Sequence, residues 1–123
     1  MVNMKSWVFA FVCLLLSCVQ ETTSKITVLD PVTFEKKISE ENVQLVDVRT
    51  PEEWEGGVIK NAKLINYFDD DFKAQLSKLD KNKPIAVYCK SGGRSGKTTQ
   101  MLSELRFKEI YDLKGGYSNW NKN

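Results

Sequence analysis

Histidine is absent from the 123 residues of this chain. Its absence excludes a histidine general base, a Ser-His-Asp triad, a Cys-His pair and any metal site with an imidazole ligand. Glycine and proline are sparse, at 7 and 3 residues, which excludes collagen-like and low-complexity chains. Whatever chemistry the protein performs must therefore proceed without imidazole.

A large excess of either charge is also missing. The 18 basic and 16 acidic residues leave a formal net charge of +2. A nucleic-acid-binding protein usually gathers a larger basic excess on one face, so we expect no nucleic-acid partner. The length and a hydrophobic content of 41% fit one compact domain.

Long apolar runs are lacking except near the amino terminus. Lys5 precedes a run of about ten apolar residues that ends before Cys18, too short to span a bilayer but typical of a signal-peptide core. The segment Leu-Leu-Ser-Cys at 15–18 resembles the bacterial lipoprotein signal, in which cleavage precedes the cysteine and its sulfur is lipidated. An ordinary secretion signal cut elsewhere and an uncleaved anchor are the alternatives.

These features predict the organisation of the chain. We expect a signal peptide over residues 1–17, a lipidated Cys18 with a polar tether over 18–24, and one domain over 25–123. The protein would then be exported to the periplasmic or cell-surface side and held on a membrane by its lipid.

Cysteine is scarce, with Cys13, Cys18 and Cys89 as its three members. Cys13 would leave with the signal peptide and Cys18 would carry lipid, so Cys89 would be the single free thiol. This excludes a disulfide within the chain and a cysteine-ligated zinc site, and we expect neither metal nor cofactor. A lone thiol is either a reactive group or a buried, inert side chain, and the residues around Cys89 indicate which of the two it is.

Strand and helix patterns alternate along the chain. We expect strands over residues 26–28, 43–48, 62–66, 84–89 and 109–113. We expect helices that start at Asp30-Pro31 and at Thr50-Pro51, and others over 71–79, 95–105 and 117–121. The alternation indicates an α/β fold with a central parallel sheet of about five strands and helices on both faces. Ligands of such sheets sit beyond the carboxyl ends of the strands, where Cys89 falls.

A glycine-rich loop, Cys-Lys-Ser-Gly-Gly-Arg-Ser-Gly-Lys-Thr at 89–98, joins the fourth strand to the next helix. Its glycines let the backbone curl and turn N–H groups inward, and the helix adds its positive end. Lys90 and Arg94 add full charges. Such a cradle favours a thiolate at Cys89. A thiolate without a base partner is suited to attack on sulfur, phosphorus or arsenic, and to holding a persulfide.

The segment Cys-Lys-Ser-Gly-Gly-Arg-Ser resembles the active-site loop of single-domain rhodaneses, which are sulfurtransferases. Leu-Val-Asp-Val-Arg at 45–49 resembles the first signature of that family, and Leu-Lys-Gly-Gly at 113–116 with Trp120 resembles its closing segment. The resemblance covers about residues 25–123 and implies a rhodanese-like fold. It implies that Cys89 carries a persulfide and that Asp47 and Arg49 support the site. The loop that would hold the sulfur consists of Lys90, Ser91, Gly92, Gly93, Arg94 and Ser95.

By this resemblance the protein would pass a sulfane sulfur from thiosulfate or a protein persulfide to a thiol or cyanide. Two departures from the family stand out. Val58 occupies a position where many members have histidine. We expect this replacement to change the packing there and not to remove the activity. Glu53 stands near the place where two-domain rhodaneses carry an arginine that binds thiosulfate, so thiosulfate is expected to be a poor substrate.

Three other functions compete with sulfur transfer. Gly-Lys-Thr at 96–98 imitates a P-loop, but Ser91 stands where that motif needs its first glycine. A cysteine phosphatase or arsenate reductase has five residues between cysteine and arginine, whereas four separate Cys89 from Arg94. A rhodanese-like module that only binds a partner or senses sulfide would keep the same motifs.

The charged residues near the loop also leave alternatives open. Arg94 either binds substrate or forms an ion pair that ties down the loop, for example with Asp47. Arg49 is either part of the catalytic machinery, a solvated charge, or the partner of Glu52 or Glu53. Asp47 either acts in catalysis or caps the loop that follows its strand.

Overall fold

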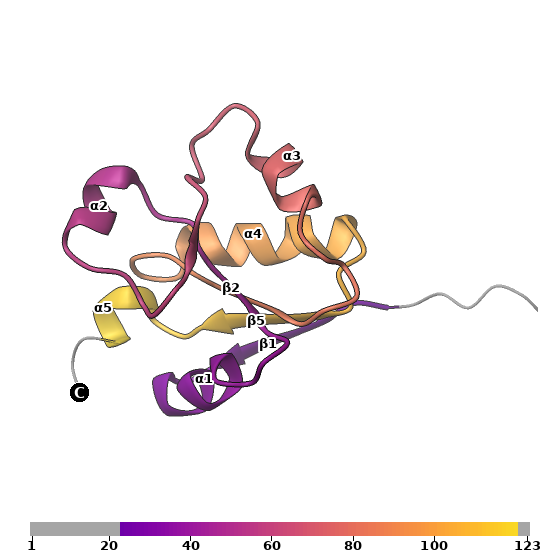
Figure 1. Cartoon of the computed structure of the whole chain (residues 1–123), viewed down its shortest axis with the longest axis horizontal. Helices are drawn as coiled ribbons and strands as arrows, with labels where there is room; N and C mark the ends of the chain where they lie inside the picture. Colours follow the sequence, from indigo (N-terminus) through magenta and orange to yellow (C-terminus); the bar gives the residue numbers. More distant parts are fainter. Residues whose placement is uncertain (1–22, 121–123) are drawn as a thin grey trace, which may run out of the picture.

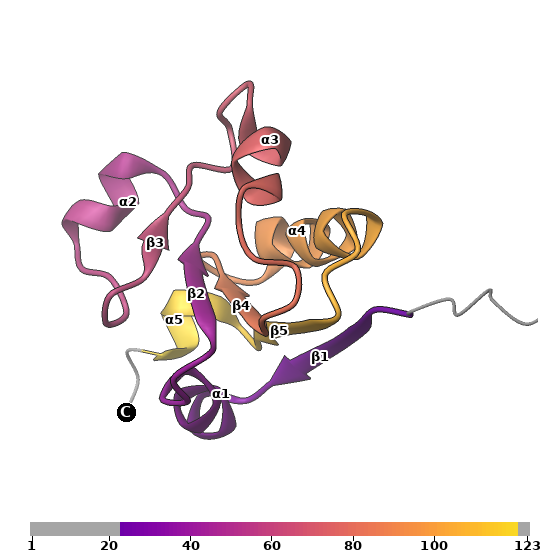
Figure 2. The ribbon, with the colours of Figure 1, turned by 45° about the vertical axis from the view of Figure 1, so that its right-hand side comes forward.

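The computed structural model of the chain describes residues 23–120. Its strands are β1 (Lys25–Leu29), β2 (Gln44–Asp47), β3 (Lys63–Leu64), β4 (Ile85–Tyr88) and β5 (Glu109–Leu113). Its helices are α1 (Pro31–Ile38), α2 (Pro51–Glu55), α3 (Phe72–Ser77), α4 (Gly93–Glu104) and α5 (Gly116–Trp120). The strands form one parallel sheet in the order β1-β5-β4-β2-β3, which confirms the expected α/β fold (Figure 2).

The central strand β4 is buried on both faces of the sheet, as its apolar sequence predicts. Ile85 and Val87 pack on one face in the same apolar cluster as residues of α3 and α4. Ala86 and Tyr88 point the other way, into a second cluster with residues of α1 and α5. The sheet is therefore covered on both sides, with α3 and α4 opposite α1 and α5 (Figure 1).

Local capping fixes where the first two helices begin. Asp30 precedes α1, and its carboxylate accepts a hydrogen bond from the Thr33 N–H at 2.8 Å. Before α2, Thr50 and Glu53 form a capping box in which each side chain accepts from the other's backbone N–H. The capping box fixes the carboxylate of Glu53 at the start of α2, which becomes important at the functional site.

Several elements differ by one or two residues at their ends from the sequence-based expectations, and two of these differences have a clear cause. β3 covers only Lys63–Leu64 instead of 62–66, because it is an exposed edge strand that pairs with β2 over two residues. The helix expected to start at Ser95 starts at Gly93, so Arg94 and Ser95 lie in its first turn. Gly92 takes a φ of +113°, which glycine adopts without strain, and its carbonyl accepts the first helical hydrogen bond at 2.9 Å from Gly96 N–H.

The amino-terminal predictions lie outside the described residues: the signal peptide over 1–17 and the lipidated Cys18. Over residues 23–120, none of the helices combines the length and the apolar character that crossing a bilayer requires.

Candidate active site

Cys89 directly follows β4, at the carboxyl end of the sheet, and its side chain is 1% exposed. The loop folds back over the sulfur. The N–H of Gly92 donates a hydrogen bond to Sγ at 3.1 Å, and the thiol donates to the Ser95 hydroxyl at 3.4 Å. The structure thus brings a backbone amide and a hydroxyl from the start of α4 to the sulfur, in the place that the sequence predicts.

The first turn of α5 also holds the loop, through hydrogen bonds to its backbone. The N–H groups of Tyr117 and Ser118 donate to the carbonyls of Cys89 and Lys90 at 2.8 and 2.9 Å. Gly116 makes this approach possible: its φ is +63°, and a Cβ there would lie 2.6 Å from the Cys89 carbonyl oxygen. The closing Gly-Gly segment is therefore a packing requirement of the loop itself.

Arg94 forms an ion pair, but with Glu53 rather than with Asp47, the partner offered as an example. Its Nη1 and Nη2 donate to the two carboxylate oxygens of Glu53 at 2.7 and 2.9 Å. Asp47 is not available because a nearer arginine occupies it. Hydrogen bonding from Arg94 lowers the pKa of Glu53 to about 2 against the opposing effect of burial. The pair therefore stays ionised at any physiological pH.

Arg49 pairs with Asp47 and not with the side chain of Glu52 or Glu53, the ion-pair partners named among the alternatives. Its Nη2 and Nε donate to the Asp47 carboxylate at 2.7 and 3.0 Å, and both side chains are almost fully buried. Burial acts to lower the pKa of Arg49, but the hydrogen bonds and charge of Asp47 outweigh it and raise that pKa. Asp47 and Arg49 are two residues apart at the end of β2, so they can pair without contacts between distant segments of the chain.

The Asp47–Arg49 pair braces the elements around the loop. The Asp47 carboxylate caps the turn by accepting from the Arg49 backbone N–H at 3.0 Å. The guanidinium donates to the Gly57 carbonyl at 2.7 Å and lies 4.1 Å from the ring centre of Tyr117 on α5. Within residues 23–120, no hydrogen bond joins either residue to Cys89, so their position is one of support.

The remaining loop residues lie on the surface. The exposed residues are Lys90, Ser91 and Gly93. Lys97, which belongs to the segment that resembles a P-loop, is exposed as well. Ser95 is fully buried beside the sulfur. The loop therefore presents its backbone and Ser95 to Sγ and its longer polar side chains to solvent.

Asp112 is a residue that the sequence analysis missed. It lies on β5, next to Val87 of β4, and is 6% exposed. Its Oδ1 has no hydrogen-bond partner in the described part of the chain. Burial raises the pKa of Asp112 to about 6, against the lowering effects of the Ser95 hydroxyl and the Leu113 N–H. Its position in the strand could have indicated that it is buried, because side chains two residues apart share a strand face and Ile110 is buried.

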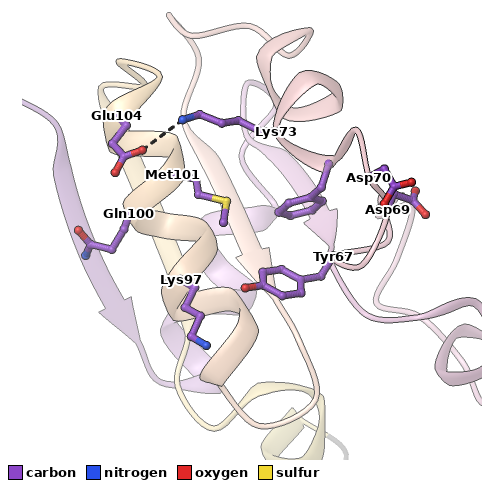
Figure 3. A pocket seen from close by; sticks show the side chains of 9 residues that line it. Tyr67, Asp69, Asp70, Lys73, Lys97, Gln100, Met101 and Glu104 are labelled. Atoms are coloured by element: carbon purple, nitrogen blue, oxygen red, sulfur yellow. Dashed lines mark hydrogen bonds and ion pairs between the residues drawn. The ribbon is translucent and has the colours of Figure 1, made fainter.

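A separate cavity of about 610 Å³ lies between α3 and α4. Figure 3 shows Tyr67 and Lys97 at one end of it and the Lys73–Glu104 ion pair across the other, with Met101 between them. None of the residues 89–95 lines it. The cavity is therefore distinct from the cysteine loop, although both border α4.

Together, the fold and the loop define a class: parallel α/β domains that hold a single cysteine in an amide-lined loop at the carboxyl end of a central strand. The sequence model of the rhodanese-like domain family matches residues 30–123. The chain belongs to this family, as its loop and flanking motifs predict.

Individual relatives agree with this assignment. The chain is 37% identical over 98 residues to a tRNA uridine(34) hydroxylase of Pelagibacter ubique, a match covering 77% of this chain and 32% of that protein. It is 40% identical over 77 residues to the uncharacterized protein YqhL of Bacillus subtilis, covering 63% of this chain and 60% of the relative. A crystal structure of a rhodanese-like domain protein from Staphylococcus aureus superimposes with a TM-score of 0.68 at 31% identity, covering 77% and 91% of the two chains.

The shared region is only part of the two curated relatives. The chain spans about a third of the hydroxylase and three fifths of the Bacillus protein. The similarity therefore defines the domain, and the activity of the whole protein is a separate question.

Proposed function

We propose that the protein is a sulfurtransferase that carries a sulfane sulfur as a persulfide on Cys89. The observation that carries the proposal is the environment of Sγ, with the Gly92 N–H at 3.1 Å and the Ser95 hydroxyl at 3.4 Å. Both groups can donate to an anionic sulfur, since a hydroxyl rotates to suit its partner. The positive end of α4 adds to this stabilisation.

The proposed reaction has two steps, and each exchanges one bond to sulfur for another. The Cys89 thiolate attacks the outer sulfur of the donor, a new S–S bond forms, and the remainder of the donor leaves with the electron pair of the broken bond. A thiol or cyanide then attacks the transferred sulfur, and Cys89 leaves as a thiolate. The donor class proposed is a small sulfur-containing anion or a protein persulfide.

The geometry argues against a phosphatase or arsenate reductase. Such chemistry needs an arginine whose guanidinium faces a tetrahedral oxyanion. Both terminal nitrogens of Arg94 are instead bound to Glu53, and the loop has four residues between Cys89 and Arg94. The hydroxylase activity named for the Pelagibacter relative is not carried over, because the match covers 32% of that protein.

Mass spectrometry after exposure to a sulfane donor tests the proposal against a module that only binds. The full chain, incubated with thiosulfate or with glutathione persulfide, should gain about 32 Da, the mass of one sulfur atom, on the peptide that contains Cys89. Addition of cyanide should remove that mass and release thiocyanate. Cys89→Ser should show neither change. Absence of a cyanide-removable sulfur on wild-type Cys89 with every donor would leave a binding module as the function.

We also propose export and lipid anchoring of the protein, on the strength of Leu-Leu-Ser-Cys at 15–18. The lipid on Cys18 would tether the domain to a membrane surface on the periplasmic or outer side. Sulfur transfer would then act on donors and acceptors available outside the cytoplasm.

A further inference from the structure

The two arginines beside the cysteine loop are each paired with a carboxylate, whereas Lys90 of the loop is exposed to solvent. Arg94 is bound through both terminal nitrogens to Glu53, and Arg49 is bound to Asp47. In place of two free guanidinium groups beside the loop, the structure has two neutralised pairs. A third carboxyl group, the buried Asp112 of β5, lies near Ser95.

The local structure around Glu53 holds its carboxylate in position to pair with Arg94. The same oxygen that binds Arg94, Oε1 of Glu53, accepts from the Thr50 N–H and hydroxyl at 3.2 and 3.0 Å. The carboxylate is thus held by the capping box of α2 before it meets the guanidinium. On its other side, the Arg94 guanidinium lies 5.8 Å from the ring centre of Phe68. Arg94 is thus held in place with both terminal nitrogens bound to Glu53.

Arg94 lies close to the sulfur in the loop, because the two residues that contact Sγ, Gly92 and Ser95, stand on either side of it in the sequence. A free guanidinium there would attract an anionic donor, and a dianion about twice as strongly as a monoanion. Because Glu53 is bound to Arg94, its negative charge neutralises the positive charge of the guanidinium. The groups that contact Sγ directly are neutral donors, the Gly92 amide and the Ser95 hydroxyl, and the positive end of α4 adds a partial charge.

We infer that Glu53 determines the charge class of the sulfur donor: by neutralising Arg94 it selects an organic persulfide over the dianion thiosulfate. This inference rests on the proposed sulfur transfer and specifies its substrate. In the favoured step, the Cys89 thiolate attacks the outer sulfur of R–S–SH. The new S–S bond forms at Sγ, the donor S–S bond breaks, and the leaving thiolate R–S⁻ takes a proton from solvent.

Glu53→Gln is the informative variant, because glutamine retains the capping box and removes the charge. It should raise kcat/KM for thiosulfate by on the order of tenfold or more, from the attraction of one unpaired charge. The value for cysteamine persulfide, an organic persulfide whose ammonium and persulfide charges cancel, should change less than threefold. Glu52→Gln is the matched control: it removes an exposed glutamate of the same helix and should change neither donor.

A second readout makes the test independent of sulfur transfer. Alkylation of Cys89 by anionic iodoacetate relative to neutral iodoacetamide reports the charge at the sulfur directly. The wild-type ratio should resemble that of glutathione, and Glu53→Gln should raise it on the order of tenfold. Adding Arg94→Gln to that variant should return the ratio to the wild-type value, because the unpaired charge is then gone.

The outcomes separate the inference from the proposed function. A wild-type ratio already far above that of glutathione, or a Glu53→Gln ratio equal to wild type, would overturn the role of Glu53 even if sulfur transfer is active. A raised ratio in a protein that accepts sulfur from no donor would support the electrostatic role and refute the sulfurtransferase. If Glu53→Gln does not fold, the wild-type ratio and the wild-type preference between the two donors decide the matter.

Discussion

Asp112 should make the folded protein less stable as pH rises from about 4 to 7. Its pKa is raised from 3.8 to about 6 in the folded state, mainly by burial. Between these values the folded protein binds more protons than the unfolded chain, so stability falls with increasing pH through this window. Above pH 6 the folded state holds a buried carboxylate whose Oδ1 has no partner in the described residues.

Asp112→Asn replaces this group with a neutral one of the same shape. A shift of about two pKa units corresponds to about 3 kcal/mol, so the variant should be more stable than wild type by about that amount at pH 7.5. At pH 4 the acid of the folded state is already protonated, and the gain should shrink to about 0.5 kcal/mol. The difference between the two pH values isolates Asp112 from the other carboxylates, which titrate in both proteins alike.

Urea unfolding followed by tryptophan fluorescence measures both free energies at each pH. Asp70→Asn serves as the control, because Asp70 is exposed and its carboxylate has no hydrogen-bond partner in the structure of residues 23–120. The reasoning is refuted if Asp112→Asn gains the same stability at both pH values, or loses stability at pH 7.5. A confirmed gain would show that the fold keeps a destabilising acid beside Ser95, as residues retained for function often are.

Three further perturbations test other parts of the structure. Gly116→Ala places a Cβ 2.6 Å from the Cys89 carbonyl and should lower the free energy of unfolding by about 2 kcal/mol or more and impair sulfur transfer; a wild-type urea midpoint and activity would contradict this packing. Arg49→Met leaves the buried Asp47 charge unpaired and should cost about 3–5 kcal/mol in a urea titration, whereas unchanged stability would mean that the pair contributes nothing. Cys18→Ser should abolish incorporation of labelled palmitate and release the protein from membranes, and wild-type protein that takes up no label would disprove lipidation.

Local patterns made the fold and the position of Cys89 predictable. The uncharged run Pro-Ile-Ala-Val-Tyr-Cys at 84–89 fits a buried strand, and the glycines after it require a tight loop. Cys89 was therefore placed correctly by residues that are its neighbours in sequence. The start of α4 was misplaced by two residues, because Gly92 rather than Ser95 ends the loop.

The electrostatic partners were harder to predict, because their identity depends on tertiary structure. Arg94 and Glu53 are 41 residues apart, and no local pattern distinguishes Glu53 from Asp47 as the partner. For Arg49, the sequence left several alternatives open, and the structure shows that Asp47, two residues earlier, binds its guanidinium. Asp112 looks like an ordinary strand residue until β5 is placed against β4 and α4 covers that face.

The support of the loop by α5 implies an order of assembly during synthesis. The donors to the Cys89 and Lys90 carbonyls belong to the last described helix, and β1, the first strand, pairs with β5, the last. A growing chain that has just exposed Cys89 therefore has neither the closed loop nor a complete sheet. Contacts between sequence-distant segments form late and slowly. The cysteine loop takes its final shape only after the other elements have been made, so the nascent chain lacks the surroundings that Cys89 has in the folded protein.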